Sequence, residues 1–138
     1  MVNLKKNKIK NKTTQKEKKI IKSSKIKKSL SIKSLTKKII HGDTLQTLKK
    51  LPSKSVNLII TSPSYMLGKE YDHERTFEDY KEYHSNVIRE CHRVLTKNGA
   101  LYWNVAQTPV NGEMRPLGAI YYTILKDANF YLKNWIIW

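Results

Sequence analysis

One segment determines the expected architecture: Val56-Asn57-Leu58-Ile59-Ile60-Thr61-Ser62-Pro63-Ser64-Tyr65. Its first half, residues 56–60, is an almost unbroken apolar run rich in β-branched side chains. Such a run is typical of a central strand covered on both faces, as in a parallel sheet. The second half, residues 61–65, is a polar loop that Pro63 stiffens by fixing its own φ. Because ligands of open α/β sheets bind at the carboxyl ends of strands, we expect functional residues in this loop.

Strand-like and helix-like segments alternate on either side of this run. The first predicted elements are a strand at 38–41 and a short helix capped by Asp43 with Gln46 and stopped by Pro52. After the apolar run come a long helix, capped by Thr76 with Asp79 and ended by Asn98-Gly99, and a strand at 100–105. A loop around Asn111-Gly112, a helix from Pro116 to about Ala128 capped by Asn129, and a strand at 130–138 complete the order. This order predicts an α/β fold with a Rossmann-like, mainly parallel sheet.

Charge divides the chain into two parts. The 138 residues carry a net charge of +16. Residues 1–38 hold 15 lysines and one acidic residue, a charge of +14, which leaves +2 for the remainder. With little apolar surface to offset the cost of ordering the chain, residues 1–37 are expected to be a largely disordered tail. Residues 38–138 are then the folded domain.

The basic tail has three possible roles. It can be a solvated extension without a specific partner, a sequence-independent ligand of nucleic-acid phosphates, or a segment that lies on an anionic membrane surface. Its apolar residues are few and include no Trp or Phe, which disfavours the membrane surface. The choice between nucleic-acid phosphates and a membrane surface depends on residues 38–138, which are considered below.

Composition excludes several other classes of protein. A single cysteine, Cys91, cannot form an internal disulfide, so a reducing compartment, the cytoplasm, is expected. The sequence contains no run of 18 apolar residues, so no membrane-spanning helix is expected. The four histidines show no metal-ligand spacing, and no metal site is expected.

The loop after residue 61 offers a specific set of groups. Ser62 supplies a hydroxyl, Pro63 a carbonyl acceptor without an N–H, and Tyr65 an aromatic ring. Two acceptors and a ring suit a planar group that bears an NH₂. The alternative is a plain type I turn with a partly buried tyrosine.

Motifs across residues 38–138 closely resemble one family, the DNA methyltransferases that modify exocyclic amino groups. The motifs lie at 39–45, 51–52, 55–60, 61–71, 93–95, 98–101, 111–113, 116–120 and 135–138. Such enzymes use S-adenosylmethionine to make N4-methylcytosine or N6-methyladenine in double-stranded DNA. The resemblance does not include the tail.

The resemblance assigns roles to the loop. Ser62 and the Pro63 carbonyl would accept hydrogen bonds from the target amino group, and Tyr65 would stack on a base flipped out of the duplex. Ser64 stands where the family has a second proline, which predicts a looser loop and reduced activity. A serine at the first position favours cytosine N4 over adenine N6.

The resemblance also concerns the cofactor. Asp43 would bind the adenine end of S-adenosylmethionine with Thr44 beside it, although Asp43 can equally be only a helix cap. Lys69, Glu70 and Tyr71 could contact DNA or order the loop, and the alternative is that they are only exposed polar loop residues. The family's glycine-rich cofactor loop does not occur in the sequence.

Because the glycine-rich loop is missing, we expect this chain to be the amino-terminal portion of a circularly permuted member of the family. A carboxyl-terminal half or a second subunit would complete it. The alternative function is an inactive remnant that acts as a basic DNA-binding or interaction protein.

Overall fold

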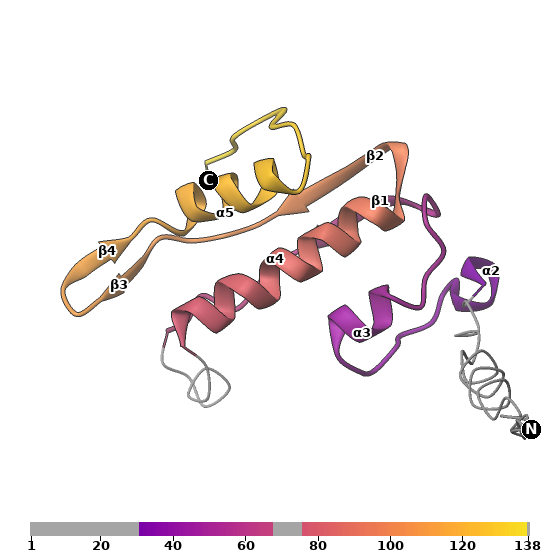
Figure 1. Ribbon diagram of the computed structural model, residues 1–138, viewed down its shortest axis with the longest axis horizontal. Coiled ribbons are helices and arrows are strands. Elements are labelled where there is room, and N and C mark those ends of the chain that lie inside the picture. The colour runs from indigo at the N-terminus through magenta and orange to yellow at the C-terminus, as the bar shows by residue number, and fades with distance from the viewer. Residues whose placement is uncertain (1–30, 68–75, 138) are drawn as a thin grey trace, which may run out of the picture.

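The computed structural model describes residues 31–67 and 76–137. Three sets of expectations lie outside the described residues: those for residues 1–30 of the tail, those for Lys69, Glu70 and Tyr71, and the last residue of the predicted strand at 130–138. The central prediction, a parallel strand–helix–strand unit, is confirmed. Strand β1 (Val56–Thr61) pairs in parallel with β2 (Leu95–Trp103), and the helix α4 (Phe77–Val94) lies between them in the sequence (Figure 1).

The long helix ends earlier than the sequence predicts. It stops at Val94, and β2 runs through Asn98-Gly99, where the helix was expected to end. The strand register jumps here, from Val56 opposite Leu95 to Leu58 opposite Ala100. A Cβ on Gly99 would lie 3.2 Å from the Asn57 carbonyl oxygen, closer than ordinary contact. Gly99 therefore allows two strands to approach closely, and it does not mark the end of the helix.

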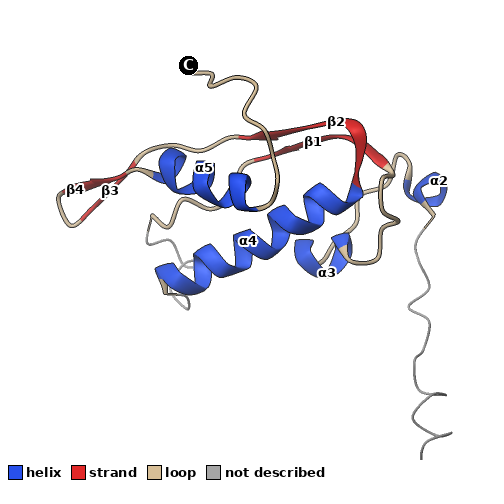
Figure 2. Ribbon diagram, turned by 45° about the horizontal axis from the view of Figure 1, so that its top comes forward, coloured by secondary structure: helices blue, strands red, loops and turns tan. Residues whose placement is uncertain are grey.

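Two helices cover one face of the strand pair. Thr76 and Asp79 form the predicted capping box of α4. Helix α5 (Leu117–Asp127) ends in a Schellman motif, in which Asn129 has φ 65° and Phe130 N–H donates to the Leu125 carbonyl. Trp103 of β2 contacts the rings of His84 in α4 and Tyr121 in α5. Figure 2 shows these two helices side by side. The buried core cluster consists of Tyr80, Ile88, Leu117, Tyr121 and Ala128.

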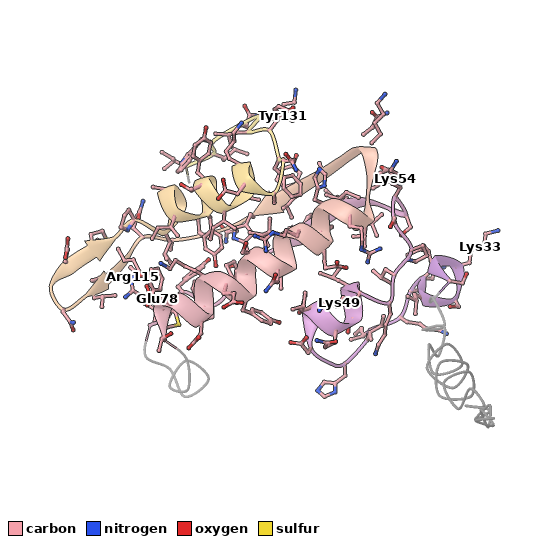
Figure 3. The ribbon with its side chains drawn as sticks, viewed as in Figure 1. Lys33, Lys49, Lys54, Glu78, Arg115 and Tyr131 are labelled. Atoms are coloured by element: carbon pink, nitrogen blue, oxygen red, sulfur yellow. The ribbon has the colours of Figure 1, made fainter. Side chains whose placement is uncertain are left out.

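A β-hairpin that the sequence analysis did not predict follows β2. Strands β3 (Thr108–Val110) and β4 (Glu113–Arg115) pair in antiparallel fashion around Asn111-Gly112, whose φ values of 52° and 82° fit a two-residue hairpin turn. The Arg115 guanidinium lies 4.0 Å from the centroid of the Phe77 ring. Figure 3 shows Arg115 near Glu78, the residue that follows Phe77. This contact ties the hairpin to the first turn of α4.

The predicted strand at 38–41 is wrong. The segment joins the one-turn helix α2 (Ile32–Leu35) to α3 (Thr44–Leu48) without any strand pairing, and Ile39 is fully exposed. A short apolar run becomes a strand only where a partner accepts its backbone hydrogen bonds. Among the described residues, β1 and β2 pair only with each other.

The predicted strand at 130–138 is also wrong over its described part. Residues 130–137 form an irregular segment that lies beside α5 (Figure 1). Phe130 packs against the core cluster, and Trp135 lies on Gly118, where an added Cβ would lie 2.9 Å from the indole ring. Tyr131, Ile136 and Ile137 remain largely exposed.

Candidate active site

The loop after β1 and the residue after β2 meet at the carboxyl end of the strand pair. The Asn104 N–H donates to the Thr61 carbonyl at 2.9 Å, which extends the pairing by one residue. The Asn104 side-chain amide reaches the Tyr65 hydroxyl at 3.4 Å, and that hydroxyl lies 2.7 Å from Ser62 Oγ. The structure therefore brings Ser62 and Tyr65 together, as the sequence predicts. It adds Asn104, which lay hidden inside the predicted strand at 100–105.

The loop side chains differ in exposure. Ser62 is exposed, whereas Pro63, Ser64 and Tyr65 are half-buried, and Tyr65 packs against the core cluster. A serine hydroxyl has one hydrogen and two lone pairs. When its hydrogen points to Tyr65, Ser62 Oγ keeps acceptor capacity at the surface. The arrangement can therefore receive a polar hydrogen from a ligand at this position.

Two buried tyrosines hold the loop from inside. The Tyr80 hydroxyl of α4 donates to the Ser64 carbonyl, and it lies 2.5 Å from the Tyr121 hydroxyl of α5. Burial raises the pKa of Tyr121 well above its usual range, and the hydrogen bond with Tyr80 adds to the shift. Tyr121 is thus a neutral hydroxyl at physiological pH. The sequence analysis treated this segment only as a capped helix and missed the contact.

Asp43 is held by a different part of α4. One carboxylate oxygen caps α3 by accepting the Gln46 N–H at 2.8 Å, as predicted, and the other accepts the Tyr83 hydroxyl at 2.8 Å. Both Asp43 and Thr44, the first residue of α3, are exposed. An exposed carboxylate held by two donors is a suitable acceptor for hydroxyl groups of a ligand. The cap is established, and cofactor binding stays a prediction.

Among the described residues, neither the cysteine nor a cluster of metal-ligand side chains offers a second site. Cys91 is buried in α4, and burial raises the pKa of its thiol to about 11. It therefore stays a protonated, unreactive thiol near neutral pH. Within residues 31–67 and 76–137, no three His, Cys, Asp or Glu side chains gather as a metal site would require. In the same ranges, no helix is long and apolar enough to cross a membrane.

Comparison with known proteins gives a consistent result. A family model described as DNA methylase, of the N6 and N4 type, matches residues 56–138. The type II methyltransferase M.BglII of Bacillus subtilis is 36% identical over 103 residues, which are 73% of this chain and 28% of that protein. The DNA adenine methyltransferase YhdJ of Escherichia coli K12 is 49% identical over 69 residues, 48% of this chain and 24% of that enzyme.

A solved structure shares the same arrangement. It is that of TTHA0409 from Thermus thermophilus, described as a DNA modification methylase, with a TM-score of 0.57 and 29% identity. The match covers 65% of this chain and 39% of that one. The chain thus spans well under half the length of these similar proteins.

Proposed function

Since this chain belongs to the family of N6 and N4 DNA methylases, we propose that it supplies the catalytic loop of an S-adenosylmethionine-dependent enzyme that methylates an exocyclic amino group in DNA. The observation that carries this proposal is the position of Ser62 and Tyr65. Their hydroxyls lie 2.7 Å apart where β1 ends beside β2, which is where open α/β sheets bind ligands.

The loop acts by positioning the amino group. Ser62 Oγ and the Pro63 carbonyl accept its two hydrogens, which directs the nitrogen lone pair at the methyl carbon. S-adenosylmethionine, when bound, supplies that methyl group on a positively charged sulfur. Formation of the C–N bond would be balanced by loss of the S–C bond and of one amino proton, and that proton would leave to solvent along its hydrogen bond to the exposed Ser62 Oγ. The loop thus needs acceptors, not a covalent nucleophile.

Tyr65 holds the base that carries the amino group. Base flipping costs a few kcal/mol, and stacking on an aromatic ring returns about 1–3 kcal/mol. The Tyr65 ring is half-buried and fixed through its hydroxyl by Ser62 and Asn104. A ring fixed in this way loses little entropy when a base stacks on its exposed part.

Asp43 and Thr44 are the described residues that would hold part of the cofactor. The Asp43 carboxylate is exposed, and its two bonded donors keep it at the start of α3. It would accept hydrogen bonds from polar hydrogens at the adenine end of the cofactor, with Thr44 beside it. This pair is only part of a cofactor site, because the sequence lacks the glycine-rich loop.

The remainder of the site would come from a complementary part of the methyltransferase fold. One face of the strand pair exposes Leu58, Ile60 and Tyr102, and Ile60 is 72% exposed. We propose that a polypeptide carrying the glycine-rich loop packs on this face, because the similar proteins are much longer than this chain. Ile60→Lys should then abolish methylation in the cell without unfolding the isolated chain, and unchanged methylation would contradict this partner.

The Lys-rich residues 1–37 are proposed to add affinity for DNA phosphates, with residues 38–138 as the catalytic part. Their chemistry is that of counterion release, which needs no sequence recognition. Lys33 of α2, Lys49 at the end of α3 and Lys54 before β1 are further basic residues of the described structure (Figure 3). The single buried thiol and this function support a cytoplasmic location.

The target base is the finer part of the proposal. Ser62 at the first motif position favours cytosine N4, whereas the similarity to an adenine methyltransferase favours adenine N6. We retain cytosine N4 as the prediction from the sequence. Either base presents the NH₂ group that the two acceptors require.

The test is a Ser62→Ala allele of the gene in its native cell, where any complementary part is present. Genomic DNA is digested to nucleosides and the modified ones are measured by mass spectrometry, with Thr123→Ala on the exposed side of α5 as the matched hydroxyl control. We expect N4-methylcytosine to fall at least 100-fold with Ser62→Ala only. A fall in N6-methyladenine instead would overturn the prediction of cytosine as the target base and would still support methylation of an amino group. No change in either nucleoside would overturn the enzyme and favour the DNA-binding remnant.

A further inference from the structure

Ser64 is the weak point of the catalytic loop, and the structure shows what restrains it. A second proline at this position would fix φ by its ring, whereas serine leaves φ free. The Ser64 carbonyl accepts the hydroxyl of Tyr80, and Ser64 Oγ accepts the Met66 N–H at 3.3 Å. Met66 adopts a left-handed φ of 55°, so the chain turns sharply here. Side-chain contacts thus restrain a backbone that the sequence alone leaves loose.

The hydrogen bonds that reach Ser64 have a defined direction. A carbonyl only accepts, so the single Tyr80 hydroxyl hydrogen is given to Ser64. In the 2.5 Å contact between the two tyrosines, Tyr121 must therefore be the donor. The result is a directed chain from Tyr121 through Tyr80 to the Ser64 carbonyl. Hydrogen bonds in such a chain polarise and strengthen one another.

The two tyrosines that anchor this series of hydrogen bonds are held by packing in the core. Tyr80 and Tyr121 are 3% and 1% exposed, on α4 and α5. The Tyr121 ring packs against Trp103 with centroids 5.2 Å apart and against His84 at 5.8 Å. The two hydroxyls are therefore fixed by the packed core rather than by the loop itself.

We propose that Tyr80 and Tyr121 are positioning residues that replace the missing second proline by tethering the Ser64 carbonyl to the core. This inference rests on the proposed function, since the loop is held for the sake of the acceptors at Ser62 and Pro63. It adds a specific compensation: the tether and a proline at position 64 do the same task. Each should therefore become dispensable when the other is present.

The first measurement concerns the loop alone. In the ¹⁵N-labelled full chain, Tyr80→Phe removes one hydroxyl and keeps the ring. The order parameter of the Tyr65 amide should fall from about 0.85 to below about 0.6. Tyr121→Phe should give a smaller fall, and the exposed Tyr122→Phe is the matched control without effect. An order parameter that Tyr80→Phe leaves unchanged would overturn the tether.

The second measurement is rescue. Ser64→Pro added to Tyr80→Phe should restore both the order parameter and methylation in the native cell, where Tyr80→Phe alone should lower methylation at least 10-fold. A double variant as impaired as Tyr80→Phe alone would overturn the compensation. Mobility that rises while methylation stays constant would overturn the positioning role, provided that Ser62→Ala abolishes methylation. If Ser62→Ala has no effect, the proposed function fails, and the order parameters still decide the tether.

Discussion

The carboxylate of Asp43 accepts a 2.8 Å hydrogen bond from the hydroxyl of Tyr83, 40 residues further along the chain. Tyr83 lies three residues after Tyr80, so the two tyrosines are neighbours on α4. One of them holds the loop before α3 and the other holds the loop after β1. A single helix thus positions both segments that the sequence marks as functional.

This arrangement separates the structural role of Asp43 from its proposed role in cofactor binding. Asp43→Ala removes the cap of α3 and the acceptor for Tyr83, and it should lower the free energy of unfolding in urea by about 1–2 kcal/mol. Asp43→Asn keeps a capping oxygen and should stay within about 0.5 kcal/mol of the native chain. If Asp43 also binds the cofactor, Asp43→Asn should still lower methylation in the native cell. Normal methylation with Asp43→Asn would contradict a role in cofactor binding and would mean that Asp43 serves only as the cap of α3.

Tyr65 offers a comparison between a ring and a hydroxyl. Tyr65→Ala removes the stacking surface, worth about 1–3 kcal/mol per base, and should slow methylation about 5- to 150-fold. Tyr65→Phe keeps the ring and loses only the bonds to Ser62 and Asn104, so it should slow methylation less than about 10-fold. The rate is measured as modified nucleoside formed after induced expression in a null strain. Equal loss in both variants would mean that the hydroxyl, not the ring, carries the effect.

Local signals were sufficient for much of the fold. The apolar run at 56–60 predicts β1, and the Thr76 cap and Asn129 predict helix ends, because each depends on a few neighbouring residues. Asn111-Gly112 carried an equally local hairpin signal that the sequence analysis treated only as a loop.

Long-range partners were beyond the sequence. The apolar segments at 38–41 and 130–137 have strand-like composition, yet no neighbouring strand pairs with them in the described part of the chain. Similarly, Tyr80 meets Ser64 across 16 residues, and Asn104 meets Tyr65 across 39. The catalytic loop was recognisable from its own residues, whereas its supports depend on how α4 and β2 pack.

Arg93 should be a main stabilising contact of the segment between α3 and β1. Its guanidinium donates to the Leu48 carbonyl at 2.8 Å and the Leu51 carbonyl at 2.9 Å, and it pairs with Glu90 at 2.7 Å. Arg93→Ala should lower the free energy of unfolding by about 1.5–3 kcal/mol, because these carbonyls lose a charged donor. The matched control is Arg89→Ala, an exposed residue that bonds Asn86 and should cost less than about 0.5 kcal/mol. Similar losses from both variants would contradict this assignment.

Cys91 should make the stability of the chain depend on pH in the alkaline range. Burial, with a smaller effect of the Glu90 charge, raises the pKa of its thiol from 9.0 to about 11. Between these values the unfolded chain loses the thiol proton and the folded chain keeps it, so this contribution is complete below pH 9.0 and is lost as pH rises through about 11. The difference in unfolding free energy between the native chain and Cys91→Ala should therefore shrink from about pH 8.5 to about 11, measured with urea under reducing conditions. A difference that stays constant across this range would refute the shift.

The tail should determine how strongly DNA binding depends on salt. Residues 1–30 contain 12 lysines and one glutamate. Each phosphate contact contributes about 0.9 to the slope of log K against log salt concentration, so loss of about five contacts would make the slope shallower by about 4.5. We expect this change when residues 1–30 are deleted or their lysines are replaced by glutamine, measured by fluorescence anisotropy on duplexes of unrelated sequence. The glutamine variant keeps the length of the tail and so isolates its charge. Equal slopes for all three proteins would exclude the tail from DNA binding, and tight binding of the native chain to anionic vesicles would then assign it to a membrane surface.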